Sequence, residues 1–277
     1  MSEKANFLKA SRQVRHENFR EGKVNQQLRY LAEETALEII INGISYSLLM
    51  QTPGWERELV TGFLYTEGLI DFPSQIASLT IQKGEGFLGL TGVEARASLP
   101  DFENREVLPE RLALSLSSCG LCGKESLDQV GRGIDRVRSR QHFLWETVAG
   151  LLTDLRQRQP LYEQTQGVHA AAMYEADGSF YSCFEDVGRH NALDKVIGHC
   201  LLNDVPFGDK LVVLSGRASL EMILKTARAG IPLFLCFSNP TTLAIEAAKS
   251  LNITLVSREK DLTLAAYTHM RRLEAKS

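Results

Sequence analysis

The sequence lacks the features that would place it in several large classes of protein. Its 277 residues contain no run of 18 apolar residues, which argues against a membrane-spanning helix, and the polar start Met1–Asn6 lacks the apolar segment of a signal peptide. Its formal net charge is only −3, so nothing global points to a nucleic acid or an anionic membrane as partner. Its five cysteines are odd in number and lack a disulfide-like spacing, which fits a reducing cytoplasm.

Several motifs of known sites are absent as well. The chain has no P-loop lysine motif, no HExxH and no zinc-deaminase signature. Residues 84–89 match the pattern GxGxxG, but turn and strand material follows instead of a helix, so we predict a hairpin loop there. A zinc site would need about two more Cys or His ligands beside one CxxC pair, and the other cysteines stand singly. We therefore predict no metal site.

The stretch of greatest chemical interest holds Cys119 and Cys122, separated by two residues. The neighbouring Lys124 favours thiolate over thiol, and a predicted helix from about 125 to 137 would stabilise a negative sulfur at its start. Such a pair is a dithiol redox pair, half of a zinc site, a sulfur-carrying loop, or simply two thiols in a glycine-rich turn. A strand at 112–116 would also suit a thioredoxin-like redox unit, so the residues alone leave these possibilities open.

The first third of the chain predicts β structure with one helix. Asn42-Gly43 lies between two apolar runs, Leu37–Ile41 and Ile44–Met50, and predicts a hairpin with a type I′ turn. A helix is expected at 55–67, followed by short strands within 76–99. At this length one large or two medium domains are expected. The predicted division is a mobile arm or peripheral strand at 1–32, a β-rich domain at 33–116, the CxxC loop at 117–124 and an α/β domain at 125–277.

The second half of the chain alternates strands and helices. After a helix at 145–156, strands are expected at 169–174, 180–184, 210–214, 232–237 and 253–256, and helices at 190–202, 218–229 and 240–250. Such alternation predicts an α/β fold with an open, largely parallel sheet and helices on its faces.

Three polar turns follow strands of this predicted sheet, and ligands of open α/β sheets bind at that end of the strands. The turns are Glu185–Asn191, Ser215–Ser219 and Ser238–Thr242. Each offers free backbone N–H groups at a helix start, which bind phosphate, and Arg189 and Arg217 add bidentate donors. We therefore predict a large, multiply phosphorylated ligand.

Purely structural roles are the alternative interpretation of these residues. The Ser, Asn and Thr residues can simply cap helices, with Asn239 as the cap of the last one. Arg189 can pair with Asp186 or Glu185, and His190 can pair with Asp194 one helical turn away. His169 precedes three alanines that would allow a ligand to approach closely, which favours a site over a core histidine. Cys183, Cys200 and Cys236 are expected to be inert packing residues.

Several of these motifs occur together and carry a family resemblance. They are CGLCG from Cys119, HAAA from His169, EDVGRHNALDK from Glu185 to Lys195, SGRAS from Ser215, TTLAIE from Thr241 and YTH from Tyr267. In this order they resemble the FdhD family, the formate dehydrogenase accessory sulfurtransferases. The resemblance runs from about residue 33 to the C-terminus.

The resemblance implies a fold, a function and a set of partners. It implies a cytoplasmic homodimer with a cytidine-deaminase-like C-terminal domain. It implies a sulfurtransferase that carries sulfur from a cysteine desulfurase to the molybdenum cofactor of formate dehydrogenase, with Cys119 as the persulfide bearer. Cys122 would assist by exchange or release the sulfur by forming a disulfide with Cys119, and the sequence leaves both open.

The ligand implied is Mo-bis(molybdopterin guanine dinucleotide), with GDP as its mimic. The family places a further cofactor contact after the last core strand, which corresponds to Arg258–Thr263. The predicted cofactor contacts are His169, Asp186, Arg189, His190, Asp194, Lys195, Ser215, Arg217, Ser219, Ser238, Thr241, Arg258, Glu259, Lys260, Asp261, Leu262 and Thr263. Alternative functions are a cofactor-binding chaperone without sulfur chemistry, a dithiol oxidoreductase and a structural zinc protein.

Overall fold

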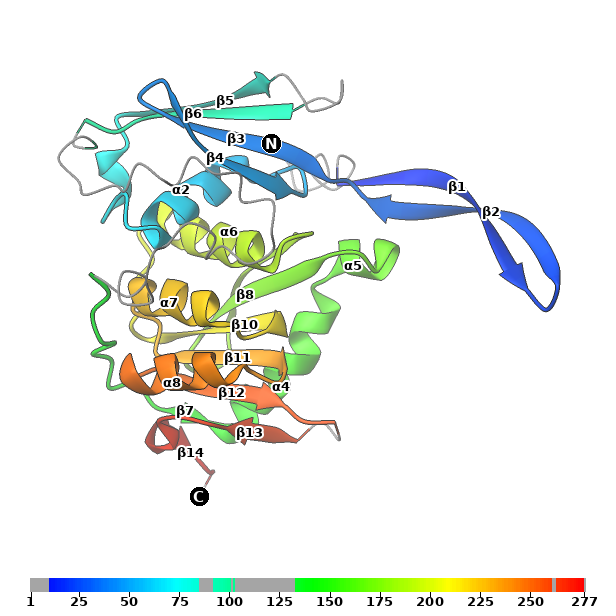
Figure 1. Cartoon of the computed structure of the whole chain (residues 1–277). Helices are drawn as coiled ribbons and strands as arrows, with labels where there is room; N and C mark the ends of the chain where they lie inside the picture. The colour runs from blue at the N-terminus through cyan, green and yellow to red at the C-terminus, as the bar shows by residue number, and fades with distance from the viewer. Residues whose placement is uncertain (1–9, 85–91, 101, 103–132, 261–262, 277) are drawn as a thin grey trace.

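The computed structural model describes residues 10–84, 92–100, 102, 133–260 and 263–276. Within them the chain forms a six-stranded sheet, a four-stranded sheet, a separate two-stranded ribbon and one short parallel strand pair (Figure 1). The short pair joins β7 (Phe143–Leu144) to β14 (Leu273–Glu274). The predicted α/β class is confirmed, with α and β elements layered through the body of the molecule.

The six-stranded sheet has the order β13-β12-β11-β10-β8-β9. Its strands are β8 (His169–Glu175), β9 (Phe180–Asp186), β10 (Lys210–Arg217), β11 (Leu233–Ser238), β12 (Thr254–Arg258) and β13 (Leu264–Ala266). Strands β9 to β12 all run in one direction, whereas β8 and β13 run in the other. Because β8 lies between β9 and β10, only the β10–β11 and β11–β12 neighbours are parallel pairs, so the sheet is mixed.

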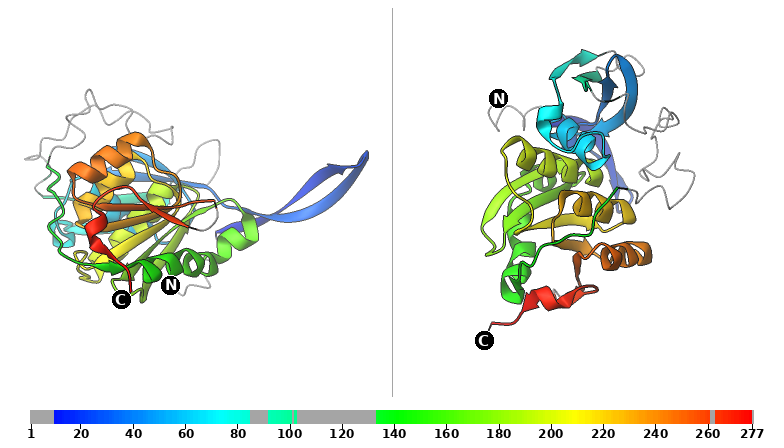
Figure 2. Two further views of the ribbon diagram at one scale, coloured as in Figure 1. Left: turned by 90° about the horizontal axis from the view of Figure 1, so that it is seen from below. Right: turned by 90° about the vertical axis from the view of Figure 1, so that its left-hand side faces the viewer.

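Helices cover both faces of this sheet. One face packs against α6 (Arg189–Leu202), α7 (Leu220–Ala229) and α8 (Thr242–Ser250), and the other packs against α4 (Trp145–Gln157) (Figure 2, left). The side chains of β10 alternate accordingly, with Val212 and Leu214 on the first face and Leu211 and Val213 on the second. This two-sided burial explains the continuous apolar run in the strand.

The four-stranded sheet has the order β4-β3-β6-β5 and one helix packed against it. Its elements are β3 (Thr35–Ile41), β4 (Ile44–Gln51), α2 (Glu56–Thr66), the short 3₁₀ helix η1 (Pro73–Gln75), β5 (Ser78–Gly84) and β6 (Gly92–Ser98). The predicted hairpin at Asn42-Gly43 is confirmed, with φ of 49° and 84° as a type I′ turn requires. The antiparallel pair β5–β6 also agrees with a hairpin around 84–91, although the loop itself lies outside the described residues.

Helices α2 and α6 join the two sheets at unusually close range. A Cβ on Gly62 would lie 1.9 Å from the carbonyl oxygen of Asp194, and a Cβ on Gly198 would lie 1.9 Å from that of Glu58. Real Cβ atoms do not approach backbone oxygens this closely, so the two glycines allow the helix backbones to touch. The joint fixes the four-stranded sheet against the larger one.

The two-stranded ribbon projects from the body of the molecule (Figures 1 and 2). It consists of β1 (Ser11–Arg20) and β2 (Lys23–Ala32), paired antiparallel along their full length. Glu21 and Gly22 form its turn with φ of 53° and 78°. The sequence reasoning predicted only an arm or a peripheral strand for this segment.

Three details differ from expectation. Residues 133–142 are not helical, so the helix predicted to reach Val137 does not extend that far, and its earlier part lies outside the described residues. The cap of α8 is Thr241, whose Oγ1 accepts a hydrogen bond from the Ala244 N–H, and not Asn239. The short helix α5 (Pro160–Thr165) was not predicted. In the part of the chain that the structure describes, no helix has the length and apolar character to cross a membrane.

Candidate functional site

The sheet register brings the three predicted turns to one edge of the six-stranded sheet. Arg217 and Ser238 are register partners at the ends of β10 and β11. His169, the first residue of the oppositely directed β8, is the register partner of Asp186 at the end of β9. The Ala170 N–H donates a hydrogen bond to Ser215 Oγ at 2.8 Å, which ties the start of β8 to the end of β10. The polar residues therefore form one cluster, which we call the strand-end site.

His169 lies at the centre of the strand-end site. A Cβ on Gly216 would lie 3.4 Å from His169 Nδ1 and 3.5 Å from the Arg189 Cδ, so the glycine leaves the histidine and the arginine close to each other. Burial lowers the pKa of His169, and electrostatic interactions with Arg189 and His190 lower it further, while Asp186 opposes them. The imidazole is therefore neutral at neutral pH and has one N–H donor and one acceptor nitrogen.

The helix starts at this edge differ in how they are capped. Thr241 caps α8 through its own side chain, as described above, which fits the purely structural interpretation of that residue. Gly188 at the start of α6 has no side chain to offer, and Ser219 at the start of α7 makes no side-chain cap. The Ser219 hydroxyl is buried and lacks a hydrogen-bond partner in the described parts of the chain. At the starts of α6 and α7 the N-cap side chain thus caps no backbone N–H group, which is the arrangement that an anion site requires.

His190 links two of these helices. Its Nε2 lies 2.9 Å from Oε2 of Glu221, in the first turn of α7, and both side chains are largely buried. The alternative interpretation, a surface pair of His190 with Asp194, is therefore wrong, because the imidazole turns toward the neighbouring helix. Glu221 was not predicted as part of the site, since nothing in its local sequence indicates a partner 31 residues away.

Asp186 and Lys195 form a buried ion pair beneath the site, with Oδ2 and Nζ 2.7 Å apart. The Asp186 carboxylate also accepts hydrogen bonds from the backbone N–H groups of Thr52 and Gly188 and from the amide of Asn191. Lys195 Nζ donates to the Thr52 carbonyl at 2.9 Å. Both side chains are at most 1 % exposed, so in this structure they hold the start of α6 against the end of β4 and do not face a ligand. We therefore correct their predicted role from contact to positioning.

Asp194 is buried in a second ion pair. Its carboxylate lies 2.8 Å from Nζ of Lys225 and accepts a hydrogen bond from the Thr66 hydroxyl, also at 2.8 Å. Glu67 lies 3.6 Å from the same ammonium group. This predicted contact residue also has a positioning role, because it locks α6 to α2 and α7. Thr52 and Thr66 were missed by the sequence reasoning, and neither carries a motif that would reveal it.

The C-terminal part of the predicted site lies at the same sheet edge. Arg258 ends β12 and is the register partner of Leu264 in β13, so the chain turns back here. The Glu259 N–H donates to the Thr263 carbonyl at 2.8 Å across this turn. Lys260 is exposed, and the predicted contacts at 261 and 262 lie outside the described residues. The described residues of the segment thus border the strand-end site.

Three of the five cysteines are packing residues, as predicted. Cys200 and Cys236 are fully buried, and burial raises the pKa of each to about 12. Cys183 is half-buried, and burial raises its pKa as well. All three are therefore protonated thiols at neutral pH. The predicted sulfur-bearing residues Cys119 and Cys122 lie outside the described residues.

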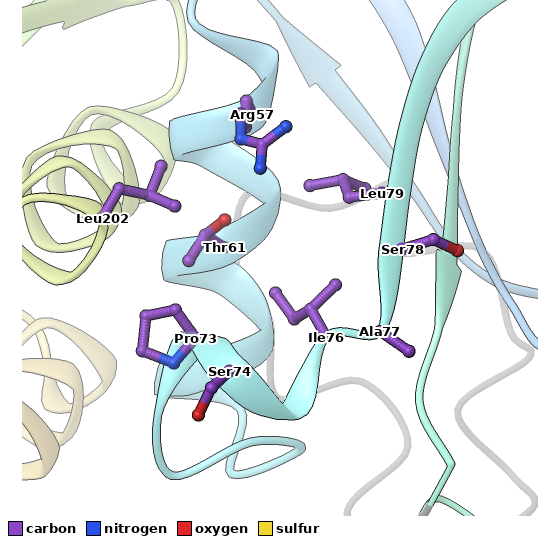
Figure 3. Close-up of a pocket in the computed structure, with 9 residues that line it drawn as sticks. All are labelled: Arg57, Thr61, Pro73, Ser74, Ile76, Ala77, Ser78, Leu79 and Leu202. Atoms are coloured by element: carbon purple, nitrogen blue, oxygen red, sulfur yellow. The ribbon is translucent and has the colours of Figure 1, made fainter.

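A cavity of about 350 Å³ lies apart from the strand-end site (Figure 3). Arg57 and Thr61 of α2 line it together with the 3₁₀ helix η1, the start of β5 and Leu202 at the end of α6. It contains none of the predicted site residues. Among the residues that the structure describes, no group of His, Cys, Asp or Glu is placed to hold a metal ion.

The fold and the strand-end site define an α/β protein whose conspicuous polar residues meet beyond the carboxyl ends of the strands of one sheet. A model of the FdhD/NarQ family matches residues 32–274 of the chain. The chain therefore belongs to the FdhD/NarQ family.

Individual relatives agree with this assignment. A protein of Nocardia farcinica named "Sulfur carrier protein FdhD" is 36% identical over 256 residues, which cover 89% of each chain. A protein of the same name from Bacillus pumilus is 34% identical over 263 residues, covering 92% of this chain and 94% of the relative. A solved structure of a putative formate dehydrogenase accessory protein from Desulfotalea psychrophila matches with a TM-score of 0.75 at 22% identity, covering 96% of this chain and 100% of that chain. At that identity the structure supports the fold alone.

Proposed function

We propose that this protein is a sulfur carrier for formate dehydrogenase. It takes sulfur from the persulfide of a cysteine desulfurase onto Cys119 and transfers it to the enzyme's molybdenum cofactor. The observation that carries the proposal is the division of the five cysteines. Three are packing thiols with raised pKa values, which leaves the pair Cys119 and Cys122 for chemistry. Relatives named as sulfur carriers support the same role.

The transfer to this protein is a thiol–persulfide exchange. The Cys119 thiolate attacks the outer sulfur of the desulfurase persulfide, the existing S–S bond breaks, and the desulfurase cysteine leaves as a thiolate. Cys119 then carries the persulfide. When the acceptor takes the outer sulfur, the S–S bond breaks and its electron pair stays on Cys119, which returns to a thiolate, while the acceptor receives a sulfur atom at the sulfane oxidation level. Lys124, five residues along the chain from Cys119, favours the thiolate that this chemistry needs.

The acceptor in this proposal is Mo-bis(molybdopterin guanine dinucleotide), bound at the strand-end site. Support comes from the uncapped starts of α6 and α7, from the exposed Arg217 and from neutral His169, which together suit phosphate and a polar heterocycle. The proposal also includes a cytoplasmic location and a homodimer.

Sulfur loading tests the carrier function. The full-length protein is incubated with a cysteine desulfurase and cysteine, and its intact mass is measured before and after cyanide treatment. We expect wild type to gain cyanide-labile sulfur, Cys119→Ala to gain none, and the control Cys183→Ala to load like wild type. The proposal fails when wild type gains no such sulfur or when Cys119→Ala gains as much. A Cys119→Ala/Cys122→Ala variant that still supports active formate dehydrogenase would identify a cofactor chaperone instead.

Nucleotide binding tests the site. Calorimetry with GDP should show binding to wild type and at least about tenfold weaker binding to Arg217→Ala, because a hydrogen bond to a charged group contributes about 1.5–3 kcal/mol. Arg20→Ala is the matched control, since it removes the same charge at the far end of β1. Equal GDP affinity of wild type and Arg217→Ala would remove Arg217 from the site.

A further inference from the structure

The cavity shown in Figure 3 lies between elements of both halves of the molecule. Its walls from α2, η1 and the start of β5 belong with the four-stranded sheet, whereas Leu202 ends α6, which packs on the six-stranded sheet. Its volume of about 350 Å³ is at the lower end of the range for pockets that hold small molecules. The cavity is therefore a candidate site for a small ligand, separate from the strand-end site.

Thr61 is the first residue that points to a ligand. Its side chain is fully buried, and its hydroxyl has no hydrogen-bond partner in the part of the chain that the structure describes. A buried hydroxyl without a partner is unfavourable, and a helical threonine can bond the carbonyl one turn earlier, as Thr226 does with Met222 at 2.7 Å. In Figure 3 the Thr61 oxygen points to the side of α2 on which the Arg57 guanidinium lies. A polar ligand atom in the cavity would supply the missing partner.

Arg57 supplies positive charge to the same cavity. It lies one helical turn before Thr61, so the two side chains project from the same face of α2. Within the described ranges its guanidinium has no ion-pair partner, and none of the nine described residues that line the cavity is acidic. Because a guanidinium matches a carboxylate through two parallel N–H donors, this open arginine favours a ligand with a carboxylate.

The rest of the lining is mostly apolar. Ile76, Leu79 and Leu202 supply aliphatic surface, and the small side chains of Ser74 and Ser78 are exposed. A phosphate ester calls for several N–H donors or cations, but among the described lining residues only the arginine of α2 carries a positive charge. The lining therefore matches a short aliphatic chain that ends in one carboxylate.

We propose that this cavity binds a small aliphatic carboxylate. The Arg57 guanidinium holds the carboxylate bidentately, and the Thr61 hydroxyl donates a hydrogen bond to it. The hydrocarbon chain lies against Ile76, Leu79 and Leu202. The described lining residues include none of those assigned to sulfur transfer or to the strand-end site, so the proposal stands independently of the sulfur-carrier function.

Titration calorimetry of the full-length protein with acetate, butanoate and hexanoate tests the site. We expect the affinity to rise about fourfold with each added methylene, because each one buries apolar surface. Hexanamide, which lacks the charge, should bind at least about tenfold more weakly than hexanoate, and Arg57→Gln should weaken hexanoate binding by a similar factor. Arg156→Gln is the matched control, since it removes an exposed arginine from α4, on the other face of the larger sheet. A wild type without saturable hexanoate binding, or an Arg57→Gln variant that binds hexanoate as tightly as Arg156→Gln, would overturn the proposal.

Thr61→Val distinguishes a binding role of the hydroxyl from a structural one. The substitution replaces the unpaired hydroxyl with a methyl group of similar size, so the ligand-free protein should melt at a higher temperature than wild type and yet bind hexanoate more weakly. Thr226→Val is the matched control, because that buried hydroxyl is paired within α7; it should gain no stability and should bind hexanoate like wild type. A lowered melting temperature or an unchanged hexanoate affinity for Thr61→Val would contradict the site.

Discussion

Glu185 lies at the end of β9, next to the buried Asp186, and holds the start of α5. Its two carboxylate oxygens accept hydrogen bonds from the backbone N–H groups of Leu161 and Tyr162, at 2.9 and 2.7 Å. These bonds favour the charged carboxylate, but burial outweighs them and raises the pKa of Glu185 to about 7. The folded protein therefore keeps this proton over a pH range in which the unfolded chain has released it.

The raised pKa of Glu185 predicts a pH-dependent stability. As pH rises from about 4.5 to about 7, the folded state binds more protons than the unfolded state, so the free energy of unfolding falls. We expect this residue to contribute a loss of about 1–3 kcal/mol across that range and no further loss above it. Urea denaturation at a series of pH values measures the slope. Glu185→Gln should flatten it, whereas the exposed Glu163→Gln should keep the wild-type slope; equal slopes in both variants would contradict the assignment.

At the scale of single residues, the sequence pointed to the block from Glu185 to Lys195 but not to the structural role of each residue in it. The block from Glu185 to Lys195 was predicted to contact a ligand, and its His190 and Arg189 do lie in the strand-end site. Asp186 and Lys195 instead pair with each other beneath the site, and Asp194 pairs with Lys225. The groups that hold these pairs in place, Thr52, Thr66 and Lys225, lie outside the block. Those residues are 30 or more positions away in the chain, so no local spacing reveals them.

Among the elements, the crossing of α2 and α6 has the tightest packing constraint. Gly62 and Gly198 each face a backbone carbonyl of the other helix at a distance that excludes a Cβ. We expect Gly62→Ala or Gly198→Ala to push the helices apart and destabilise the protein by about 1–3 kcal/mol or more. Thermal and urea denaturation measure the loss.

Gly150 in α4 provides the control for this prediction. It is also a helical glycine, but a Cβ there meets nothing within 4 Å. Gly150→Ala should therefore stabilise the protein by about 0.4–1 kcal/mol, because alanine is the better helix former and restricts the unfolded chain. A similar small gain for Gly62→Ala would show that the helices are not in contact as described.

The elements that the sequence predicted well are those with a strong local signal. The turn at Asn42-Gly43 and the alternating strands and helices after residue 167 follow from turn chemistry and periodicity. For the ribbon the sequence predicted only an arm or a peripheral strand, although Val24, Gln26, Leu28, Tyr30 and Ala32 share one face, because its polar partner strand hides the alternation. The antiparallel place of β8 inside the sheet depends on strand order, which a pattern along the chain does not contain.

For the whole molecule, the joint between the two sheets should make unfolding a single event. The ring of Trp55, just before α2, lies 5.1 Å from that of Phe184 on β9, centroid to centroid. The Thr52 N–H and the Thr66 hydroxyl donate hydrogen bonds across the same joint to the buried carboxylates of Asp186 and Asp194. If the two sheets separated, both buried carboxylates would lose these hydrogen bonds, and a buried polar group without its partner is costly. The two sheets are thus expected to unfold together.

The two tryptophans of the chain allow this to be measured. Trp55 reports on the joint, and Trp145, at the start of α4, reports on the opposite face of the six-stranded sheet. In Trp145→Phe and Trp55→Phe, the fluorescence of the remaining tryptophan should change at the same urea concentration as the far-UV circular dichroism of that variant. Separate midpoints in either variant would mean that the sheets unfold independently.

The deeply buried thiols of Cys200 and Cys236 can report how often the interior of the protein opens to solvent. A thiol reagent can modify these thiols only when the structure around them opens, so their labelling rate in the native protein measures how often that opening occurs. Because Cys200 lies in α6 and Cys236 in β11 of the same buried cluster, comparing their labelling rates would tell whether the helix and the sheet open together or separately.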